Sequence, residues 1–223
     1  MAVNTRNSIV TNGLVLALDA GNTKSYVSGS TTWRDLSGNN NSGSLVNGPT
    51  YSNINGGSIV LDGSDDYVTF GNVAALNFTT PFSIGCWFRA SSTQPSIDSA
   101  IMGNINGTYT GYMLWYNNNT VDFYFNGAIR ANSTTSILAN TWYNVVGVWT
   151  GTTAILYLNG VLDASGAYST PPSNGNPLFT IGQYQISRNF AGNVSICTVY
   201  NRALTTQEIL QNYNATKTRF GLT

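Results

Sequence analysis

Short runs of alternating apolar and polar residues cover most of the chain, and turns rich in Asn, Gly and Ser separate them. The turns recur about every ten positions, a spacing that is typical of an antiparallel sandwich or barrel. In residues 82–90, Phe82, Ile84, Cys86 and Phe88 share one face of the expected strand, and the residues between them share the other. The pattern predicts an all-β protein, with further strands at 58–62 and 66–70 and a long last strand within 189–201.

Two Asn-Gly pairs, Asn126-Gly127 and Asn159-Gly160, stand between strand-like residues. Such a pair suits a type I′ turn, because both central residues of that turn take a positive φ. We therefore predict two tight hairpins, the second of them inside a meander that starts near residue 142.

One helix is predicted, over residues 206–214. Thr205 stands three residues before Glu208, which is the spacing of a capping box, and Leu204 and Ile209 can form a hydrophobic staple around it. No long linker interrupts the chain, so we predict one domain over residues 13–214, between an N-terminal arm (1–12) and a C-terminal tail (215–223). We expect the two ends to anchor the protein to a partner.

The low content of charged residues narrows the range of partners. They make up 8% of the 223 residues, and nine basic and nine acidic side chains give a net charge of zero. Without a basic stripe, nucleic acid and anionic membranes are not expected as partners. A near-neutral surface favours packing against other proteins or other copies of the chain. No apolar run approaches the ~20 residues of a membrane helix, and we expect no signal peptide at the start.

Cys86 and Cys197 lie inside apolar, strand-like runs. The simpler interpretation is two buried free thiols. A disulfide requires that the two strands are neighbours in the fold.

Five segments, in this order, resemble the concanavalin A-like lectin/glucanase superfamily, in its laminin-G-like or pentraxin-like branch. They are WRDLSGNNNSGSL, SIVLDGSDDYVTF, FSIGCWFRA, WYNVVGVWTGTTAILYLNGVLDASG and FAGNVSICTVYNRALTTQEIL. The resemblance spans roughly residues 13 to 213. It implies a two-sheet antiparallel jelly-roll sandwich, to which the sequence adds one short C-terminal helix.

The segments TNGLVLALDAGNTKSY and YNATKTRFG carry a narrower resemblance, to virion structural proteins of tailed phages, notably marine and cyanobacterial ones. This resemblance implies a protein of the capsid or tail, with phage coat or tail proteins as partners and the virion as its location. It agrees with the expected lack of a signal peptide, because virions assemble in the cytoplasm of the host.

The side chains required for most enzyme chemistry are scarce. The chain has no histidine, which excludes Ser-His-Asp and Cys-His catalysis. Glycoside hydrolysis requires two carboxyl groups that flank the scissile bond, and Glu208, the chain's glutamate, is expected to cap a helix. Asp65 and Asp66 are neighbours on a strand entry and point to opposite faces. We therefore expect no enzymatic activity and no required cofactor.

Calcium is the metal that the oxygen-rich side chains suit. The resemblance implies a structural ion near the loop after Trp33, where Asp35, Asn39 and Asn40 match, with Asp19 as a further carboxylate. The alternative is an Asx-turn, in which Asp35 and the asparagines bond their own backbone. Ser195, where many relatives have an acid, favours this alternative.

Sugar binding is the activity that the resemblance implies, through aromatic rings that stack on pyranose faces and amides that read hydroxyl groups. The candidates are Tyr109, Trp115, Tyr116, Asn117, Asn118 and Tyr184. The alternative for each aromatic residue is a place in the core, and Trp87, Trp142 and Trp149 fit that place best.

The sequence thus leads to a non-enzymatic structural protein of a tailed-phage particle, which stabilises the particle, adheres to polysaccharide on the host surface, or does both. A homo-oligomer or multi-copy assembly is expected. The alternative hypothesis is a free carbohydrate-binding lectin of bacterial origin.

Overall fold

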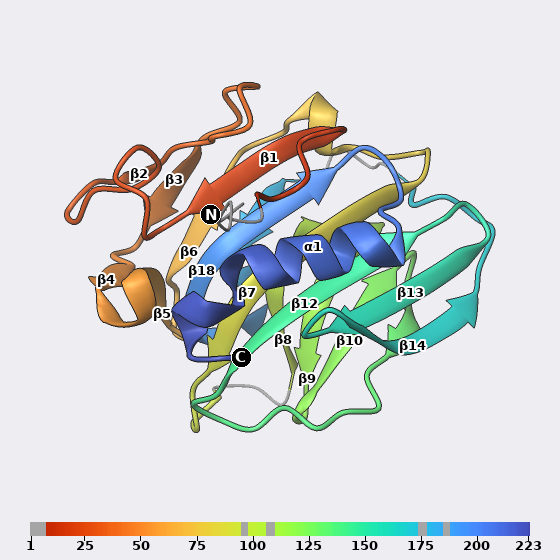
Figure 1. Ribbon diagram of the computed structural model, residues 1–223. Helices are drawn as coiled ribbons and strands as arrows, with labels where there is room; N and C mark the ends of the chain where they lie inside the picture. Colours follow the sequence, from red (N-terminus) through yellow and green to blue (C-terminus); the bar gives the residue numbers. More distant parts are fainter. Residues whose placement is uncertain (1–7, 95–97, 106–109, 174–177, 185–187) are drawn as a thin grey trace, which may run out of the picture.

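The computed structural model describes residues 8–94, 98–105, 110–173, 178–184 and 188–223. Within them the chain forms two large antiparallel β-sheets that pack face to face, and helix α1 (Thr206–Thr216) lies on the outer face of one of them (Figure 1). We call the sheet beneath α1 the front sheet and the other the back sheet. The predicted all-β sandwich with one C-terminal helix is confirmed.

The front sheet has the last long strand near its centre. Its strand order is β14 (Val161–Ala167), β13 (Thr153–Leu158), β12 (Trp142–Trp149), β7 (Phe82–Ala90), β18 (Ala191–Tyr200), β5 (Ser58–Asp62) and β4 (Thr50–Ser52), and β1 (Leu14–Asp19) also pairs with β18. β12, β13 and β14 form the predicted meander.

The back sheet carries the hairpins of the middle of the chain. Its strand order is β11 (Ala128–Asn132), β10 (Thr120–Phe125), β9 (Gly111–Asn117), β8 (Asp98–Ile105), β15 (Phe179–Ile181), β6 (Tyr67–Thr69), β3 (Gly43–Val46) and β2 (Thr32–Trp33). A small ribbon of β16 (Gln183–Tyr184) and β17 (Arg188–Asn189) lies beside β8.

Asparagine supplies the positive φ that the tight hairpins require. Both residues of the Asn126-Gly127 and Asn159-Gly160 turns have positive φ, which confirms the two predicted hairpins. The β9–β10 turn reaches the same conformation with Asn118 (φ 45°) and Asn119 (φ 67°), a conformation that asparagine adopts more readily than most residues.

The core lies between the two sheets and is rich in aromatic rings. Phe82 of the front sheet packs against Tyr112 of the back sheet, with ring centroids 4.5 Å apart. Phe82, Ile84, Cys86 and Phe88 all face this core, as the alternation predicted. The strand predicted at 66–70 is shorter, Tyr67–Thr69, and before it the side chain of Asp66 accepts from the amide of Asp62.

The outer face of the front sheet is covered by the C-terminal segment. Helix α1 begins with the predicted capping box between Thr205 and Glu208. It ends at Thr216, two residues later than predicted, and continues into η3 (Lys217–Phe220). Phe220 stacks on Trp87 with ring centroids 4.1 Å apart, so residues 217–220 are held by tertiary contacts. Two further short 3-10 helices are η1 (Ile54–Gly56) and η2 (Ala74–Leu76).

The first described residues lie against α1. The amide of Val10 donates to Oδ1 of Asn212 over 2.7 Å, and Nε2 of Gln211 donates to the carbonyl of Ser8 over 2.8 Å. Residues 1–7, the rest of the predicted N-terminal arm, lie outside the described residues.

The two cysteines face each other across neighbouring strands. Cys86 of β7 and Cys197 of β18 are paired in register, and both are buried free thiols. Burial raises the pKa of both thiols, so they are poor nucleophiles in the folded protein.

Within the described residues, no helix has the length and apolar character to cross a bilayer.

Candidate functional site

A groove lies on the outer face of the back sheet, the face turned away from the core and from α1. Its cavity volume is about 190 Å³. This is less than the roughly 300–1,000 Å³ of pockets that enclose drug-sized ligands, so it suits a single ring of a longer ligand. Its lining is an apolar and aromatic floor of Met113, Trp115, Tyr124 and Ile129, with Asp98, Asn117, Tyr184 and Arg188 around it.

The alternation of strand residues builds the floor. On β9, Tyr112, Leu114 and Tyr116 enter the core, so Met113 and Trp115 face outward. On β10, Phe123 and Phe125 are core residues, and Tyr124 faces outward opposite Met113. The same rule that fills the core thus places a second, smaller aromatic cluster on the outer face of the sheet.

The rings of the floor hold one another in place. Tyr124 stacks beside Trp115 with centroids 6.1 Å apart and an interplanar angle of 28°. Tyr184 of β16 meets the indole ring edge-on, at 5.7 Å and 67°. The Trp115 side chain is mostly covered, at 9% exposure, so its orientation is fixed before any ligand arrives.

Polar side chains are positioned beside this floor. Asp122 is fully buried on the same face as Trp115. Its Oδ2 accepts from Nδ2 of Asn117 over 3.0 Å, and its Oδ1 accepts from Nδ2 of Asn132. Burial raises the pKa of Asp122, while these two amide bonds act in the opposite direction. Asp122 therefore fixes the side chain of Asn117 at the groove.

Three of the six predicted sugar-binding residues come together here: Trp115, Asn117 and Tyr184. Tyr116 points into the core, where its hydroxyl donates to Oδ1 of Asn119 over 2.8 Å. Asn118 lies in the exposed β9–β10 turn. Tyr109 lies outside the described residues. Trp87, Trp142 and Trp149, predicted as core, are all buried.

Five lining residues were not predicted. Tyr124, Met113 and Ile129 could have been found, because they occupy outward positions beside Trp115 in the hairpins. Asp98 and Arg188 are 90 positions apart and form an ion pair. No local pattern indicates such a contact.

Two larger hollows, of about 370 and 390 Å³, lie elsewhere on the molecule. The first lies between the loop after Tyr26 and strand β4, and the second lies beside β5 and the start of β18. Among the described residues, no charged side chain lines the first hollow and no aromatic side chain lines the second. The groove at Trp115 combines both kinds of side chain.

The family profile described as "Concanavalin A-like lectin/glucanases superfamily" matches residues 62–210. These residues include the whole of the groove. The chain belongs to this superfamily. A search of curated proteins gave no match.

Solved structures share the superfamily fold with this chain. The binding domain of the Paraclostridial Mosquitocidal Protein 1 has a TM-score of 0.74 at 17% identity and covers 92% of this chain and 52% of its own. Domain 4 of AbnA, a GH43 extracellular arabinanase from Geobacillus stearothermophilus solved in complex with arabinotriose, has a TM-score of 0.69 at 15% identity and covers 90% and 98%. Trypanosoma rangeli sialidase has a TM-score of 0.71 at 16% identity, and the match covers 92% of this chain and 33% of the sialidase chain.

The chain therefore spans about half of the mosquitocidal chain, a third of the sialidase chain and nearly all of the arabinanase domain. At these identities the likeness shows the fold of the superfamily alone. Two of the three structures are single domains of larger proteins, one of them named a binding domain.

The loop for which the superfamily resemblance implied calcium is closed by hydrogen bonds. Oδ1 of Asp35 accepts from the amides of Ala17 and Ser37, each over 2.9 Å, and Oδ2 accepts from Ser37 Oγ and the Asn41 amide. These are the Asx-type contacts of the alternative interpretation. A cation at Asp35 would have to displace these donors, and calcium there stays a prediction.

Two of the other predicted ligands of that ion, Asn39 and Asp19, have hydrogen-bond partners of their own. Nδ2 of Asn39 donates to the carbonyl of Leu14 over 3.2 Å, and Asn40 supplies a positive φ of 59° to the loop. Oδ1 of Asp19 accepts from Nη1 of Arg219 over 2.6 Å and from the Gly21 amide.

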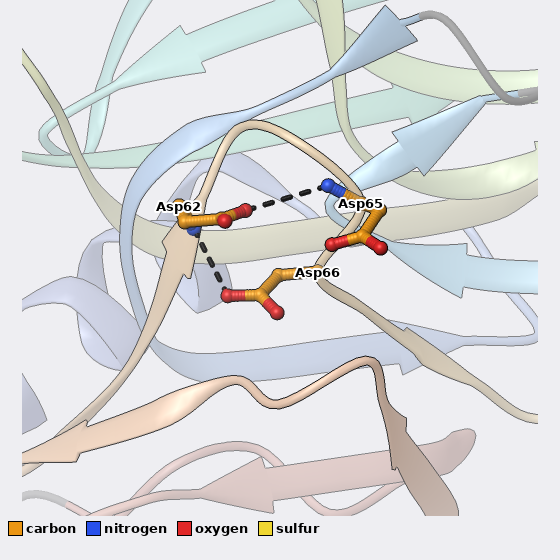
Figure 2. A group of neighbouring side chains, drawn as sticks. All are labelled: Asp62, Asp65 and Asp66. Carbon is orange, nitrogen blue, oxygen red and sulfur yellow. Dashed lines mark hydrogen bonds between the residues drawn. The ribbon is translucent and has the colours of Figure 1, made fainter.

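A different group of carboxylates lies at the β5–β6 connection. One carboxylate oxygen each of Asp62, Asp65 and Asp66 lies within 4.8 Å of the others (Figure 2). Hydrogen bonds from backbone amides, above all that of Ser64, lower the pKa of Asp62. Burial raises the pKa of Asp66, and the charges of Asp62 and Asp65 add to the rise. Calcium takes such oxygen ligands, so this cluster could hold a calcium ion.

Proposed function

We propose that this chain is a carbohydrate-binding domain that holds one sugar ring of a glycan in the groove over Trp115. The observation that carries the proposal is the aromatic floor of Trp115, Tyr124 and Tyr184 with the fixed amide of Asn117 beside it. Membership of a superfamily of lectins and glucanases supports it.

The groove matches the two kinds of surface on a sugar. The C–H groups on one face of a pyranose ring are apolar and pack on an aromatic ring, whereas the hydroxyl groups require donors and acceptors. Asn117 offers both a donor and an acceptor at a position that Asp122 holds fixed. A prearranged site of this kind binds without a large loss of side-chain entropy.

The lining of the groove favours binding over hydrolysis. Glycoside hydrolysis by the usual mechanism uses two carboxyl groups about 5–5.5 Å or 6.5–9.5 Å apart. Among the described residues that line the groove, Asp98 supplies the carboxylate, and it is paired with Arg188. Glu208 is bound to Arg202 at the start of α1, on the front sheet.

The test is a glycan array followed by titration calorimetry of the glycans that bind. Truncation of a central aromatic residue in a binding site costs about 2 kcal/mol or more, so we expect Trp115→Ala to weaken binding by about thirtyfold or more. Tyr67→Ala is the matched control, because Tyr67 lies on β6 of the same sheet and does not line the groove. Equal affinities of wild type and Trp115→Ala would remove the groove from the proposal.

The location of the domain is a further part of the proposal. We propose that it is carried on the capsid or tail of a tailed phage, with coat or tail proteins as partners, and that it adheres to polysaccharide on the host surface. The support is the likeness of the segments at residues 11–26 and 213–221 and the zero net charge. Mass spectrometry of purified particles tests this; a protein found free in bacterial culture and lacking from particles would favour the free lectin.

A further inference from the structure

The charged residues of the groove are already joined to each other. Asp98 comes from β8 and Arg188 from β17, and Nη1 of Arg188 donates to Oδ1 of Asp98. The two side chains are 22% and 37% exposed, so water screens the pair only in part. Both residues line the groove beside Trp115.

Other charged side chains near the groove are turned away from it. Asp122 is fully buried and accepts from Asn117 and Asn132. The guanidinium of Arg130 lies 3.8 Å over the ring of Tyr168 and donates to the carbonyls of Phe125 and Asn126. Among the described lining residues, Arg188 is therefore the cation that a ligand can reach.

We propose that Asp98 makes the groove selective for uncharged glycans, because its carboxylate occupies the guanidinium of Arg188. This inference rests on the proposed function and names the class of ligand. A uronic or sialic acid bound to the other N–H donors of Arg188 would place its negative charge beside Asp98, and one that took the place of Asp98 would lie against the displaced carboxylate. Like charges brought together in a binding site select strongly against a ligand.

The same ion pair suits neighbouring hydroxyl groups of a neutral sugar. A guanidinium has five N–H donors, and a carboxylate has two oxygen atoms that accept. One N–H donor of Arg188 is used within the pair, so other N–H groups of the same guanidinium can donate to hydroxyl groups of the sugar. The groove thus suits a ring with one apolar face on Trp115 and hydroxyl groups at the edge beside Arg188.

The test compares neutral and acidic forms of one sugar series. The probes are gluco-, galacto- and manno-oligosaccharides, each beside the uronic acid form in which the exocyclic CH₂OH group is a carboxylate. We expect wild type to prefer the neutral form by about tenfold or more, and Asp98→Asn to reduce this preference by about tenfold by releasing Arg188. The gained binding of the acid should weaken as NaCl rises from about 0.05 to about 0.5 M.

Two further variants separate the role of Asp98 from the general effect of losing one negative charge and from a loss of folding. Asp163→Asn removes the same charge from β14, where Asp163 accepts from the amide of Thr134, and should leave the preference unchanged. Arg188→Gln leaves the Asp98 carboxylate at the groove and should preserve or increase the preference for neutral probes, even if Asp98→Asn does not fold.

The outcomes distinguish this inference from the proposed function. If Trp115→Ala weakens binding but Asp98→Asn leaves the preference for neutral probes unchanged, the inference about Asp98 is wrong and the groove is still the proposed binding site. Preference of wild type for the acidic form, or loss of the preference in Arg188→Gln, also overturns it. If no probe binds wild type or Asp98→Asn, both proposals fail.

Discussion

Nη1 of Arg219 lies 2.6 Å from Oδ1 of Asp19, which ties the C-terminal 3-10 helix η3 to the first strand across 200 positions of sequence. The same guanidinium donates to the carbonyls of Asn55 and Gly57 and to Oγ of Ser195. Arg219 lies in the C-terminal tail that we expected to anchor the protein to a partner, and its guanidinium is bound within the domain. It joins β1, η1, β18 and the end of the chain at one point.

Removal of Arg219 should destabilise the domain. Arg219→Ala removes the charged donor from Asp19, from the carbonyl of Gly57 and from Oγ of Ser195, and a hydrogen bond to a charged group contributes about 1.5–3 kcal/mol. We expect the free energy of unfolding to fall by about that amount in urea denaturation. Lys217→Ala is the control in the same 3-10 helix, since its Nζ lies 5.6 Å from the Tyr213 ring centroid and such an exposed contact contributes about 0.5–1 kcal/mol. Equal losses in the two variants would contradict the central role of Arg219.

Glu208 should make stability depend on pH in the acid range. A hydrogen bond from Arg202, together with the backbone amide of Thr205, lowers the pKa of Glu208 from 4.5 to about 2. Because the folded pKa lies below the unfolded one, its contribution is complete above pH about 4.5 and is lost as the pH falls toward 2. Glu208→Gln should be less stable than wild type at pH 7, and the difference should shrink below pH about 4.5. Denaturation from pH 2 to 7 measures it; a constant difference over that range would refute this cause.

Asp122 should act on ligand binding through Asn117. In Asp122→Asn one carboxylate oxygen becomes an N–H donor, so the amides of Asn117 and Asn132 can no longer both keep their present acceptors. We expect glycan affinity to fall by about fivefold, which corresponds to the roughly 1 kcal/mol of one hydrogen bond. Asp163→Asn is the control for charge. Calorimetry with circular dichroism separates this loss from unfolding, and unchanged affinity in a folded Asp122→Asn would exclude a positioning role.

Substitution can distinguish the two candidate calcium positions. The hydrogen bonds described at Asp65 use its backbone, so Asp65→Asn removes a charge from the cluster and leaves them in place. We expect any calcium-dependent rise in melting temperature to disappear in Asp65→Asn, to persist in Asp35→Asn and to be reversed by EDTA. A rise that Asp35→Asn alone removes would place the ion in the loop after Trp33.

The fold could be predicted because its determinants are local. Alternation on the strands, Asn-Gly at the turns and the capping box at Thr205 each lie within a few residues, and each has the predicted structure. Residues 217–220 have no such local pattern. Their helix depends on Phe220 stacking on Trp87 and on Arg219 reaching Asp19, which are contacts between distant parts of the chain.

The site could be predicted only in part, for the same reason. Trp115 and Tyr116 were both candidates, yet neighbours on a strand face opposite sides, so at most one of them can face a ligand. Tyr112 and Leu114 face the core, so Trp115, which alternates with them along the strand, is the residue that faces outward. The pairing of Asp98 with Arg188 arises where the β16–β17 ribbon lies beside β8, and this arrangement follows from the whole fold.

Helix α1 and the C-terminus lie on the outer side of the front sheet (Figure 1), and Ser8 is bound to α1. The groove is on the far face of the back sheet. A biotin, bead or fusion partner joined at residue 223 would therefore sit behind the binding face. The domain immobilised in this way would turn the groove toward the bulk solution, so surface-based affinity measurements can use a C-terminal tag without blocking the groove.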